Sequence, residues 1–200
     1  MTRDEVTRLR AANVPAARGV VLDVGVGSGL NLPFYTGAVT KLYGVDRSPE
    51  LLARARPLTA TAPFPVDLLN QDADRLSLAD ACVDTVVITW SLCSISNTAG
   101  ALSEMGRVLK PGGALIFVEH GLSPDAGVGT WQNRLTPLWR RCAGGCHLNR
   151  KTDDLLRGAG FTIESLRTGY VPGPRALTFM YEGRAVKNIE SGKRKVESGK

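Results

Sequence analysis

The chain has 200 residues, of which 43% are hydrophobic and 22% charged, and its formal net charge is +6. No apolar run approaches the roughly 20 residues of a membrane-spanning helix, so we expect a cytoplasmic protein without stable membrane insertion. Residues 187–200 hold five basic and two acidic side chains, which is half of the excess positive charge. We therefore predict one domain, residues 1–186, followed by a disordered basic tail, and no nucleic acid as partner.

The first predicted elements are a helix over residues 5–17 and a buried strand that runs into a glycine-rich turn. The run Val20-Val21-Leu22-Asp23-Val24 is typical of a parallel strand covered on both faces. Gly25, Gly27 and Gly29 follow, and they allow a sharp turn against which a ligand can pack. Leu30 stands where a dehydrogenase fingerprint needs glycine, and the lysine of a P-loop is absent.

A second strand, residues 41–46, ends in Asp46, which comes 17 residues after Gly29. An acidic side chain at such a strand end accepts hydrogen bonds from both hydroxyls of a ribose. The glycine turn and this acid together indicate a cofactor that contains a nucleoside. A short helical turn is expected between the two strands at residues 31–35, where Pro33 suits only the first turn.

The elements after Asp46 complete an α/β pattern. Ser48 as N-cap and Pro49 at the first helical position predict a helix that stops near Pro57. The motif Pro111-Gly112-Gly113 predicts a turn. The further predicted strands are 63–70, 83–89, 114–118, 161–166 and 176–184, the last two an antiparallel pair, and the further helices are 98–109 and 152–158. This alternation predicts a mostly parallel sheet.

Four motifs occur in an order that is typical of one enzyme family. They are the glycine turn, Asp46, Gln71-Asp72-Ala73, and the segment 104–118 with its Pro-Gly-Gly turn. From about residue 20 to 186 the chain resembles class I methyltransferases (methyltransferase type 11), which use S-adenosylmethionine (SAM). The resemblance implies a Rossmann-like, doubly wound sheet of seven strands, mostly parallel with an antiparallel terminal strand, and SAM as the cofactor.

The resemblance also implies which residues bind the cofactor. Asp23 would organise the glycine loop at the methionine end, the three glycines would allow close approach, and Ser28 would bond the carboxylate. Asp46 would hold the ribose, and Asp72 and Ala73 would meet the adenine. The full set of expected cofactor residues is Asp23, Gly25, Gly27, Ser28, Gly29, Asp46, Asp72, Ala73 and Thr89, the last of them beside the sulfonium.

Residues 31–35, 92–95, 119–120 and 145–152 resemble the small thiol S-methyltransferases more closely. This implies a small-molecule acceptor, the sulfur of a thiol or of hydrogen sulfide. A thiolate is the reactive form, so His120 and His147 are candidate catalytic bases, with a structural role as the alternative for each. The candidate substrate-pocket residues are Cys93, Glu119, Trp131, Trp139 and Cys146; the alternative is that these cysteines and tryptophans only pack the core.

The region 119–150 follows the fifth strand, and ligands of parallel sheets bind beyond the carboxyl ends of strands. We therefore expect the substrate here. Disulfides are not expected among the four cysteines of a cytoplasmic chain. The sequence Cys142-x-x-x-Cys146-His147 lacks the second ligand pair of a structural zinc site, so no metal site is expected.

Two other functions remain open. Related bacterial sequences are grouped with phospholipid N-methyltransferases, and residues 131–141, with two Trp and three Arg, offer a surface for peripheral contact with phosphatidylethanolamine. A module that binds SAM as a sensor, without turnover, is the non-enzymatic alternative. The oligomeric state is left open.

Overall fold

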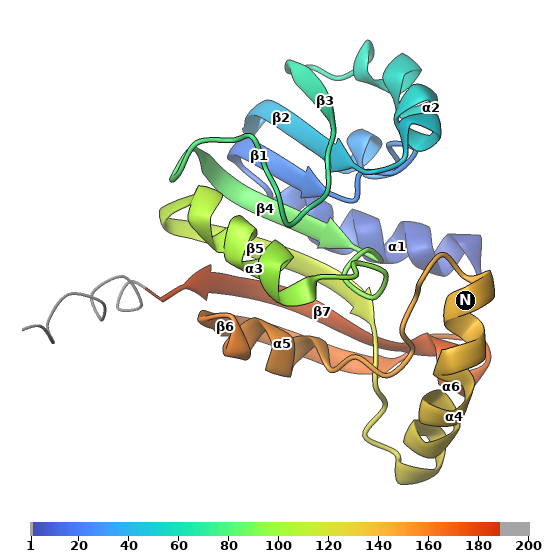
Figure 1. Cartoon of the computed structure of the whole chain (residues 1–200). Coiled ribbons are helices and arrows are strands. Elements are labelled where there is room, and N and C mark those ends of the chain that lie inside the picture. The colour runs from blue at the N-terminus through green and yellow to red at the C-terminus, as the bar shows by residue number, and fades with distance from the viewer. Residues whose placement is uncertain (1, 189–200) are drawn as a thin grey trace, which may run out of the picture.

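Seven strands form one sheet in the order β3-β2-β1-β4-β5-β7-β6 (Figure 1). The computed structural model describes residues 2–188. All neighbouring strands run parallel except β7, which is antiparallel to both β5 and β6. The strands are β1 (Gly19–Val24), β2 (Val39–Asp46), β3 (Val66–Asn70), β4 (Val83–Thr89), β5 (Leu109–His120), β6 (Phe161–Tyr170) and β7 (Phe179–Lys187). The predicted fold class is confirmed.

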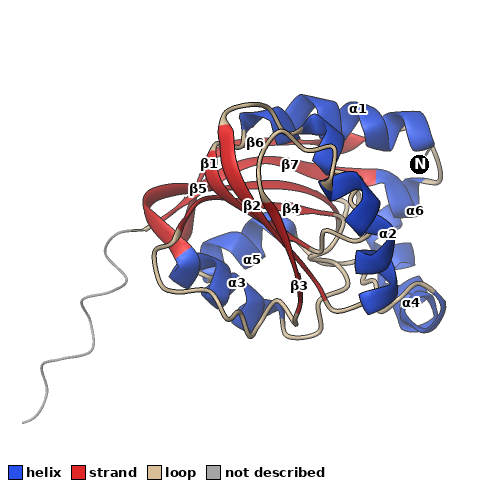
Figure 2. Cartoon of the chain, turned by 90° about the horizontal axis from the view of Figure 1, so that it is seen from above, coloured by secondary structure: helices blue, strands red, loops and turns tan. Residues whose placement is uncertain are grey.

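The helices lie on both faces of this sheet and beyond its end. Helix α1 covers one face, whereas α3 and α5 cover the other (Figures 1 and 2). The helices are α1 (Arg3–Asn13), α2 (Pro49–Thr59), α3 (Thr98–Val108), α4 (Ala126–Cys142), α5 (Thr152–Gly158) and α6 (Arg175–Thr178), with short 3-10 turns at Val14–Ala16 and Leu32–Phe34. None of the helices between residues 2 and 188 has both the length and the apolar character of a bilayer-spanning segment.

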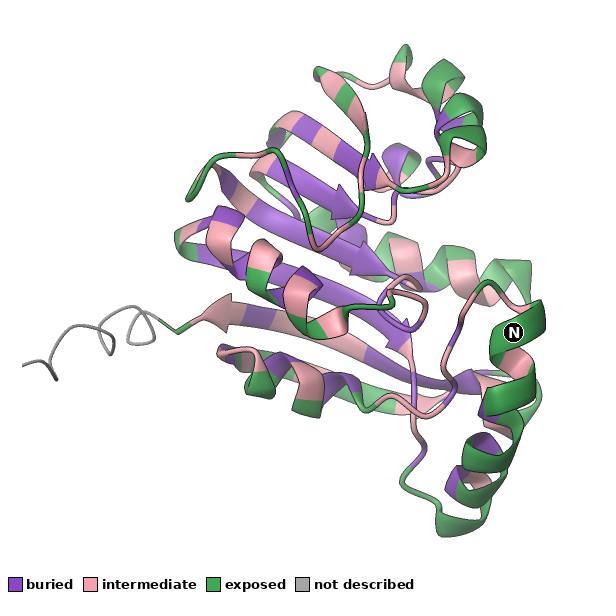
Figure 3. Ribbon diagram, in the orientation of Figure 1, coloured by how far each residue is buried: buried purple, intermediate pink, exposed green. Residues whose placement is uncertain are grey.

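Alternation along the central strands builds two cores, one on each side of the sheet. Val21 belongs to the core on the side of the Val14–Ala16 turn, while its neighbour Leu22 belongs to the core under α3 and α5. The same alternation places Ile116 on the first side and Phe117 on the second. Burial on both faces explains why these strands are nearly continuously apolar, and Figure 3 shows them as the buried centre of the molecule.

Prolines account for several differences between the predicted and observed elements. The first helix gives way after Asn13 to a 3-10 turn, because Pro15 lacks an amide hydrogen and disfavours helix in the residue before it. Strand β3 begins only after Pro65. In contrast, α2 continues past Pro57 to Thr59, because a proline in the last turn removes only one hydrogen bond.

The other differences concern turns. The predicted turn at Pro111-Gly112-Gly113 is a bulge inside β5: Leu109 pairs with Val83 and Ala114 with Thr85, so β5 accommodates three extra residues there. The last strand was predicted from residue 176, but residues 175–178 form α6 behind Pro174, and β7 follows. Lys187, assigned to the tail by sequence, is the last residue of β7; residues 189–200 of the predicted tail lie outside the described part.

The core under α3 supports a stability prediction. Met105 is fully buried against the sheet, whereas Ser103 on the same helix is exposed. We expect Met105→Ala to lower the free energy of unfolding by about 2–5 kcal/mol, because it leaves a cavity in a packed core. Ser103→Ala should change it by less than about 0.5 kcal/mol. Chemical denaturation of both variants checks this, and equal effects of the two would contradict the packing described.

Candidate functional site

A cavity of about 740 Å³ opens at the carboxyl ends of the central strands. It lies where the strand order reverses, since β1 is followed by β2 on one side and by β4 on the other. Such a reversal separates the loops that leave neighbouring strands and creates a crevice. The loops after β1, β2, β3 and β4 line the cavity, together with Arg10 of α1 and Gly144 after α4.

The glycine turn after β1 forms one wall. Gly25, Gly27 and Gly29 all have positive φ angles, of 71°, 55° and 80°, which other residues rarely adopt. A Cβ atom on Gly25 would lie 2.1 Å from Oγ of Ser91, so the absence of a side chain there lets the loops after β1 and β4 approach each other. The backbone N–H of Gly25 donates to the carbonyl of Val45 at 2.8 Å, which ties the turn to β2.

Asp46 links the glycine turn to the next helix. Its Oδ2 accepts a hydrogen bond from the backbone N–H of Gly27 at 2.9 Å, and its Oδ1 accepts one from Ser48 at 2.9 Å. A carboxylate has about four acceptor positions, so two remain for a ligand in the cavity that Asp46 lines. This geometry suits the recognition of two neighbouring hydroxyls.

Asp23 acts on the cavity through a neighbour. It is fully buried and does not line the cavity, but both its oxygens accept from Nδ2 of Asn31 at 3.1 Å, and Asn31 does line it. Asn31 also exchanges hydrogen bonds with Oγ1 of Thr89 and accepts one from Nε of Arg10 at 2.9 Å. Burial raises the pKa of Asp23 to about 6, against the opposing effects of Asn31 and Arg10.

Sequence reasoning did not assign Arg10, Asn31 and Trp90 to this site. The Arg10 guanidinium lies 4.7 Å from the ring centre of Trp90, and all three residues line the cavity. Trp90 has a φ of 49°, a strained value for a large side chain, at the residue that follows β4. Asn31 stands in the marked segment 31–35, and Trp90 directly follows the predicted strand 83–89. Arg10 belongs to a helix distant in sequence, and its neighbours in sequence give no sign of a role in this site.

Most of the predicted cofactor residues meet in this cavity. Gly25, Gly27, Ser28, Asp46, Asp72, Ala73 and Thr89 all line it. Gly29 is buried below the turn, where a Cβ atom would lie 3.0–3.3 Å from Leu32, Ala55 and Leu58, and thus supports the turn from behind.

Three predicted catalytic and substrate residues form a second cluster next to the cavity. The ligand atoms of Cys93, His120 and Cys146 lie within 4.8 Å of one another, and Nε2 of His120 is 3.1 Å from Sγ of Cys146. Hydrogen bonds from Cys93 and His120 lower the pKa of Cys146. For Cys93 the direction is the opposite: its hydrogen bond with Cys146 and its burial raise its pKa. Burial alone would lower the pKa of His120, but Cys146 raises it overall.

Glu119 holds the loop after β4 rather than the neighbouring histidine. It is fully buried, and its Oε1 accepts from the backbone N–H groups of Ser91 and Leu92 at 2.8 and 3.0 Å. Nδ1 of His120 has no hydrogen-bond partner among the described residues, so Glu119 does not orient the imidazole through a hydrogen bond. Burial raises the pKa of Glu119 to about 7.

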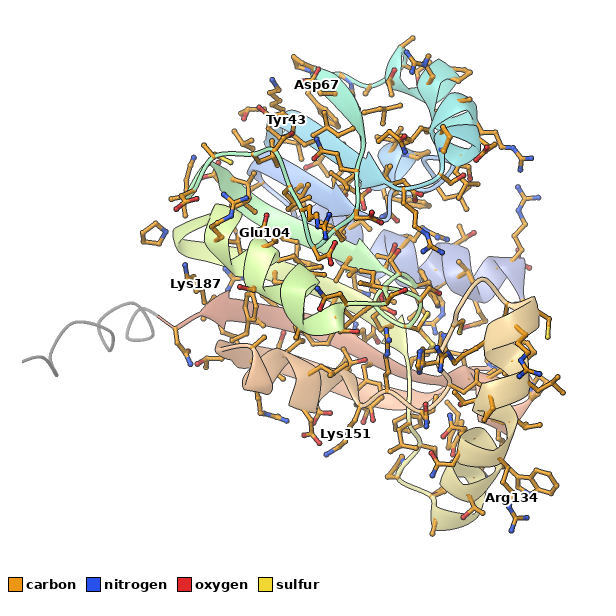
Figure 4. All side chains as sticks on the ribbon, in the orientation of Figure 1. Tyr43, Asp67, Glu104, Arg134, Lys151 and Lys187 are labelled. Carbon is orange, nitrogen blue, oxygen red and sulfur yellow. The ribbon has the colours of Figure 1, made fainter. Side chains whose placement is uncertain are left out.

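The remaining predicted residues lie farther from the cavity. The backbone N–H of His147 donates to the carbonyl of Cys93 at 2.9 Å. The pKa of the His147 imidazole is lowered, mainly by burial and to a smaller extent by the charge of Arg150. Trp139 packs against Cys93 and Cys146 and belongs to the wall of the cluster. Trp131 does not belong to the cluster, because it is 58% exposed on the outer face of α4. Figure 4 shows Arg134 of the same helix pointing away from the sheet.

Comparison with known proteins places the chain among methyltransferases. The Methyltransferase domain family matches residues 22–117. Thiol S-methyltransferase TMT1B of Rattus norvegicus is 35% identical over 146 residues, which is 71% of this chain and 59% of that protein. Phosphatidylethanolamine N-methyltransferase of Cereibacter sphaeroides is 42% identical over 115 residues, 56% of each. The chain thus spans just under three fifths of the length of these two relatives.

Two further matches support the family and the fold. An uncharacterized methyltransferase of Mycobacterium tuberculosis is 34% identical over 142 residues, 66% of this chain and 71% of that protein. The crystal structure of a SAM-dependent methyltransferase from Methanosarcina mazei has a TM-score of 0.69 at 20% identity and covers 86% of this chain and 93% of its own. At that identity, the structural match shows the fold alone.

Proposed function

The chain belongs to the SAM-dependent methyltransferases, and we propose that it transfers the methyl group of SAM to the sulfur of a small thiol or of hydrogen sulfide. The observation that carries this proposal is the cluster of Cys93, His120 and Cys146 behind the cavity wall. Ser94, which contacts Cys93, and Gly144, two residues before Cys146, both line the cavity. The similarity to a thiol S-methyltransferase supports the same acceptor.

The lining of the cavity supports one orientation of SAM. The adenine lies by Asp72 and Ala73, the ribose on Asp46, and the methionine part crosses the glycine turn. The amino acid end then reaches Asn31 and Arg10, where the guanidinium meets the carboxylate of SAM. Thr89, at the end of β4, lies next to the sulfonium in this orientation.

The reaction needs positioning more than it needs a strong base. The acceptor sulfur attacks the methyl carbon in line with the bond to the sulfonium; that bond breaks, and S-adenosylhomocysteine leaves as a neutral thioether. A free thiol with a pKa of about 8.5 is only a few per cent thiolate at neutral pH. A site that favours loss of the thiol proton therefore raises the reactive fraction. In this proposal the Cys93, His120 and Cys146 cluster promotes that loss, and His147 only borders the cluster.

A second candidate is N-methylation of a phospholipid headgroup. The Cereibacter relative is named for phosphatidylethanolamine, and α4 presents Trp131, Leu138 and Arg134 to solvent. Exposed aromatic and aliphatic side chains beside a basic one are typical of a helix that lies on a lipid surface. This candidate places the acceptor amine, rather than a thiol, at the mouth of the cavity.

A turnover assay separates these functions. Purified protein with SAM is offered sodium sulfide, methanethiol, a larger alkyl thiol and phosphatidylethanolamine vesicles in separate reactions. We expect S-adenosylhomocysteine and a methyl sulfide with at least one thiol. Methylation of the lipid alone would replace the thiol acceptor with the second candidate. SAM binding without turnover on any acceptor would favour a sensor and overturn both.

Asp46 provides a first test of the cofactor orientation. We expect Asp46→Ala to weaken SAM binding at least about 100-fold in calorimetry, because two hydrogen bonds from hydroxyls to a charged group, each about 1.5–3 kcal/mol, are lost. The control is Asp67→Ala on the edge strand β3, labelled in Figure 4, which removes only a surface ion pair with Lys41. Circular dichroism shows whether each variant is folded. Unchanged affinity in a folded Asp46 variant would contradict this orientation.

Arg10 provides a test of the opposite end. Removal of its guanidinium in Arg10→Ala should weaken SAM binding about 10- to 100-fold, as expected for a charge-assisted hydrogen bond. Arg8→Ala, on the same helix but paired with Glu5 on the surface, is the matched control. If the two variants bind SAM equally well, the carboxylate of SAM does not lie at Arg10.

The raised pKa of Asp23 predicts how SAM binding depends on pH. With a pKa of about 6, Asp23 in the cofactor-free protein is mostly protonated at pH 5, whereas the cationic SAM favours the ionised form. Affinity should therefore fall on acidification below pH 6, by up to about tenfold per pH unit. The pKa of Asp23 is higher in the folded protein than its usual value of 3.8, so folding favours the protonated form. Protonation of Asp23 therefore adds stability as the pH falls from 7 to 5, and weaker binding at pH 5 does not come from unfolding caused by this residue. Asp23→Asn should bind more weakly and lose this dependence between pH 5 and 8.

A further inference from the structure

The Cys93, His120 and Cys146 cluster brings together two sulfurs and one imidazole from three separate segments. Cys93 follows β4, His120 ends β5, and Cys146 follows α4. The hydrogen bond from the backbone N–H of His147 to the carbonyl of Cys93 joins the first and last of these segments. Because the three side chains are anchored by the sheet and by this bond, their mutual position does not depend on one flexible loop.

These three side chains suit zinc. Zinc is bound in proteins by cysteine thiolates and histidine, at about 2.3 Å for sulfur and about 2.0–2.1 Å for nitrogen. In a tetrahedral site this keeps ligand atoms roughly 3.5–4 Å apart. The ligand atoms of this cluster already lie within 4.8 Å of one another, so small rotations of the side chains close a site around one ion.

The surroundings of the cluster also favour a cation. Oε2 of Glu119, on the residue next to His120, is buried and has no hydrogen-bond partner in the described part of the chain. Two thiolates without a cation would add two negative charges next to this carboxyl group. A divalent ion with two thiolate ligands and a neutral imidazole forms a centre of zero net charge, so both cysteines can ionise there without adding net negative charge. Simple core packing of Cys93 and Cys146 gives no reason for an imidazole at the same point.

The ligand set differs from the one suggested by the sequence motif. Cys142 is exposed on α4, where its Sγ donates to the carbonyl of Leu138, and it is not part of the cluster. The partners of Cys146 are instead Cys93 and His120, which are 53 and 26 residues earlier in the chain. The expectation that the chain has no metal site considered only ligands close together in sequence.

We propose that Cys93, His120 and Cys146 bind one zinc ion, and that its fourth coordination position takes the acceptor thiol. Three protein ligands with one open position are typical of catalytic zinc. A thiol that enters the open position loses its proton to solvent and binds as thiolate. Its sulfur then forms the new bond to the methyl carbon as the bond to the SAM sulfonium breaks, and the neutral thioether product leaves zinc because it is a weaker ligand.

The thiol-binding half of this proposal rests on the proposed S-methylation, whereas the zinc site does not. The first experiment therefore measures metal alone. Full-length protein, purified without thiols or chelators, is incubated with zinc chloride and dialysed, and the metal is counted by mass spectrometry. We expect one zinc per chain in the wild type and in Cys142→Ser, and loss of stoichiometric zinc in Cys93→Ser and Cys146→Ser. Circular dichroism shows whether each variant is folded. The number of zinc ions per wild-type chain tests the site even if a cysteine variant does not fold.

The second experiment tests the open position without any methyl transfer. Cobalt(II) replaces zinc, and ethanethiol is titrated while the sulfur-to-cobalt absorption is recorded. An increase in this absorption that saturates supports thiol binding at the metal. No change, with cobalt bound, would overturn the thiol-binding half even if thiols are methylated. Wild-type protein that is active and folded but binds no zinc, or that contains a Cys93–Cys146 disulfide, would overturn the site itself.

Discussion

A buried carboxylate at the end of β5 determines the arrangement of both parts of the site. Glu119 accepts hydrogen bonds from the backbone N–H groups of Ser91 and Leu92, and so fixes the chain where it leaves β4. Ser91 in turn packs against the side-chain-free Gly25, which sets the distance between the loops after β1 and β4. Cys93 follows in the same loop. The cavity and the cysteine cluster therefore depend on one anchor.

This anchor has an energetic cost, which the structure offsets only in part. Burial raises the pKa of Glu119 to about 7, and one of its oxygens has no partner among residues 2–188. Arg150 supports the same loop from the other side, since its guanidinium donates to the carbonyls of Leu92 and Ile95. The positive φ of Trp90 shows that the loop accepts backbone strain as well. Strain and buried charge together indicate a loop held in place for function.

The cavity is divided by charge in a way that fits a zwitterionic cofactor with a positive sulfur. Asp46 lines one end of the cavity. At the other end Asn31 is hydrogen-bonded to both Arg10 and the buried Asp23, and the charge of Arg10 acts on Asp23 as well. Asn31 transmits the charge of Asp23 to the surface of the cavity, although Asp23 itself does not reach it. Arg10 also stacks on Trp90, so α1 closes the site opposite the glycine turn.

Local patterns in the sequence determined the central strands, the glycine turn and the strand-end acid, because apolar alternation and glycine spacing depend on neighbours a few residues apart. Strand β4 and helix α5 begin and end where they were predicted, and most of the expected cofactor residues line one cavity. The positions of turns near prolines and the β5 bulge were predicted less well, since pairing with other strands decides them.

Only the tertiary structure decided which distant side chains act together. Arg10 joins the cavity because α1 packs back across the ends of the strands, and no local pattern indicates that contact. Trp131 and Trp139, eight residues apart, face solvent and the cluster respectively, because α4 buries only one side. Cys93 and His120 meet because the parallel strands β4 and β5 end at one edge of the sheet, whatever their separation in the chain. The segment after α4 places Cys146 against them, whereas Cys142 stays exposed on the helix.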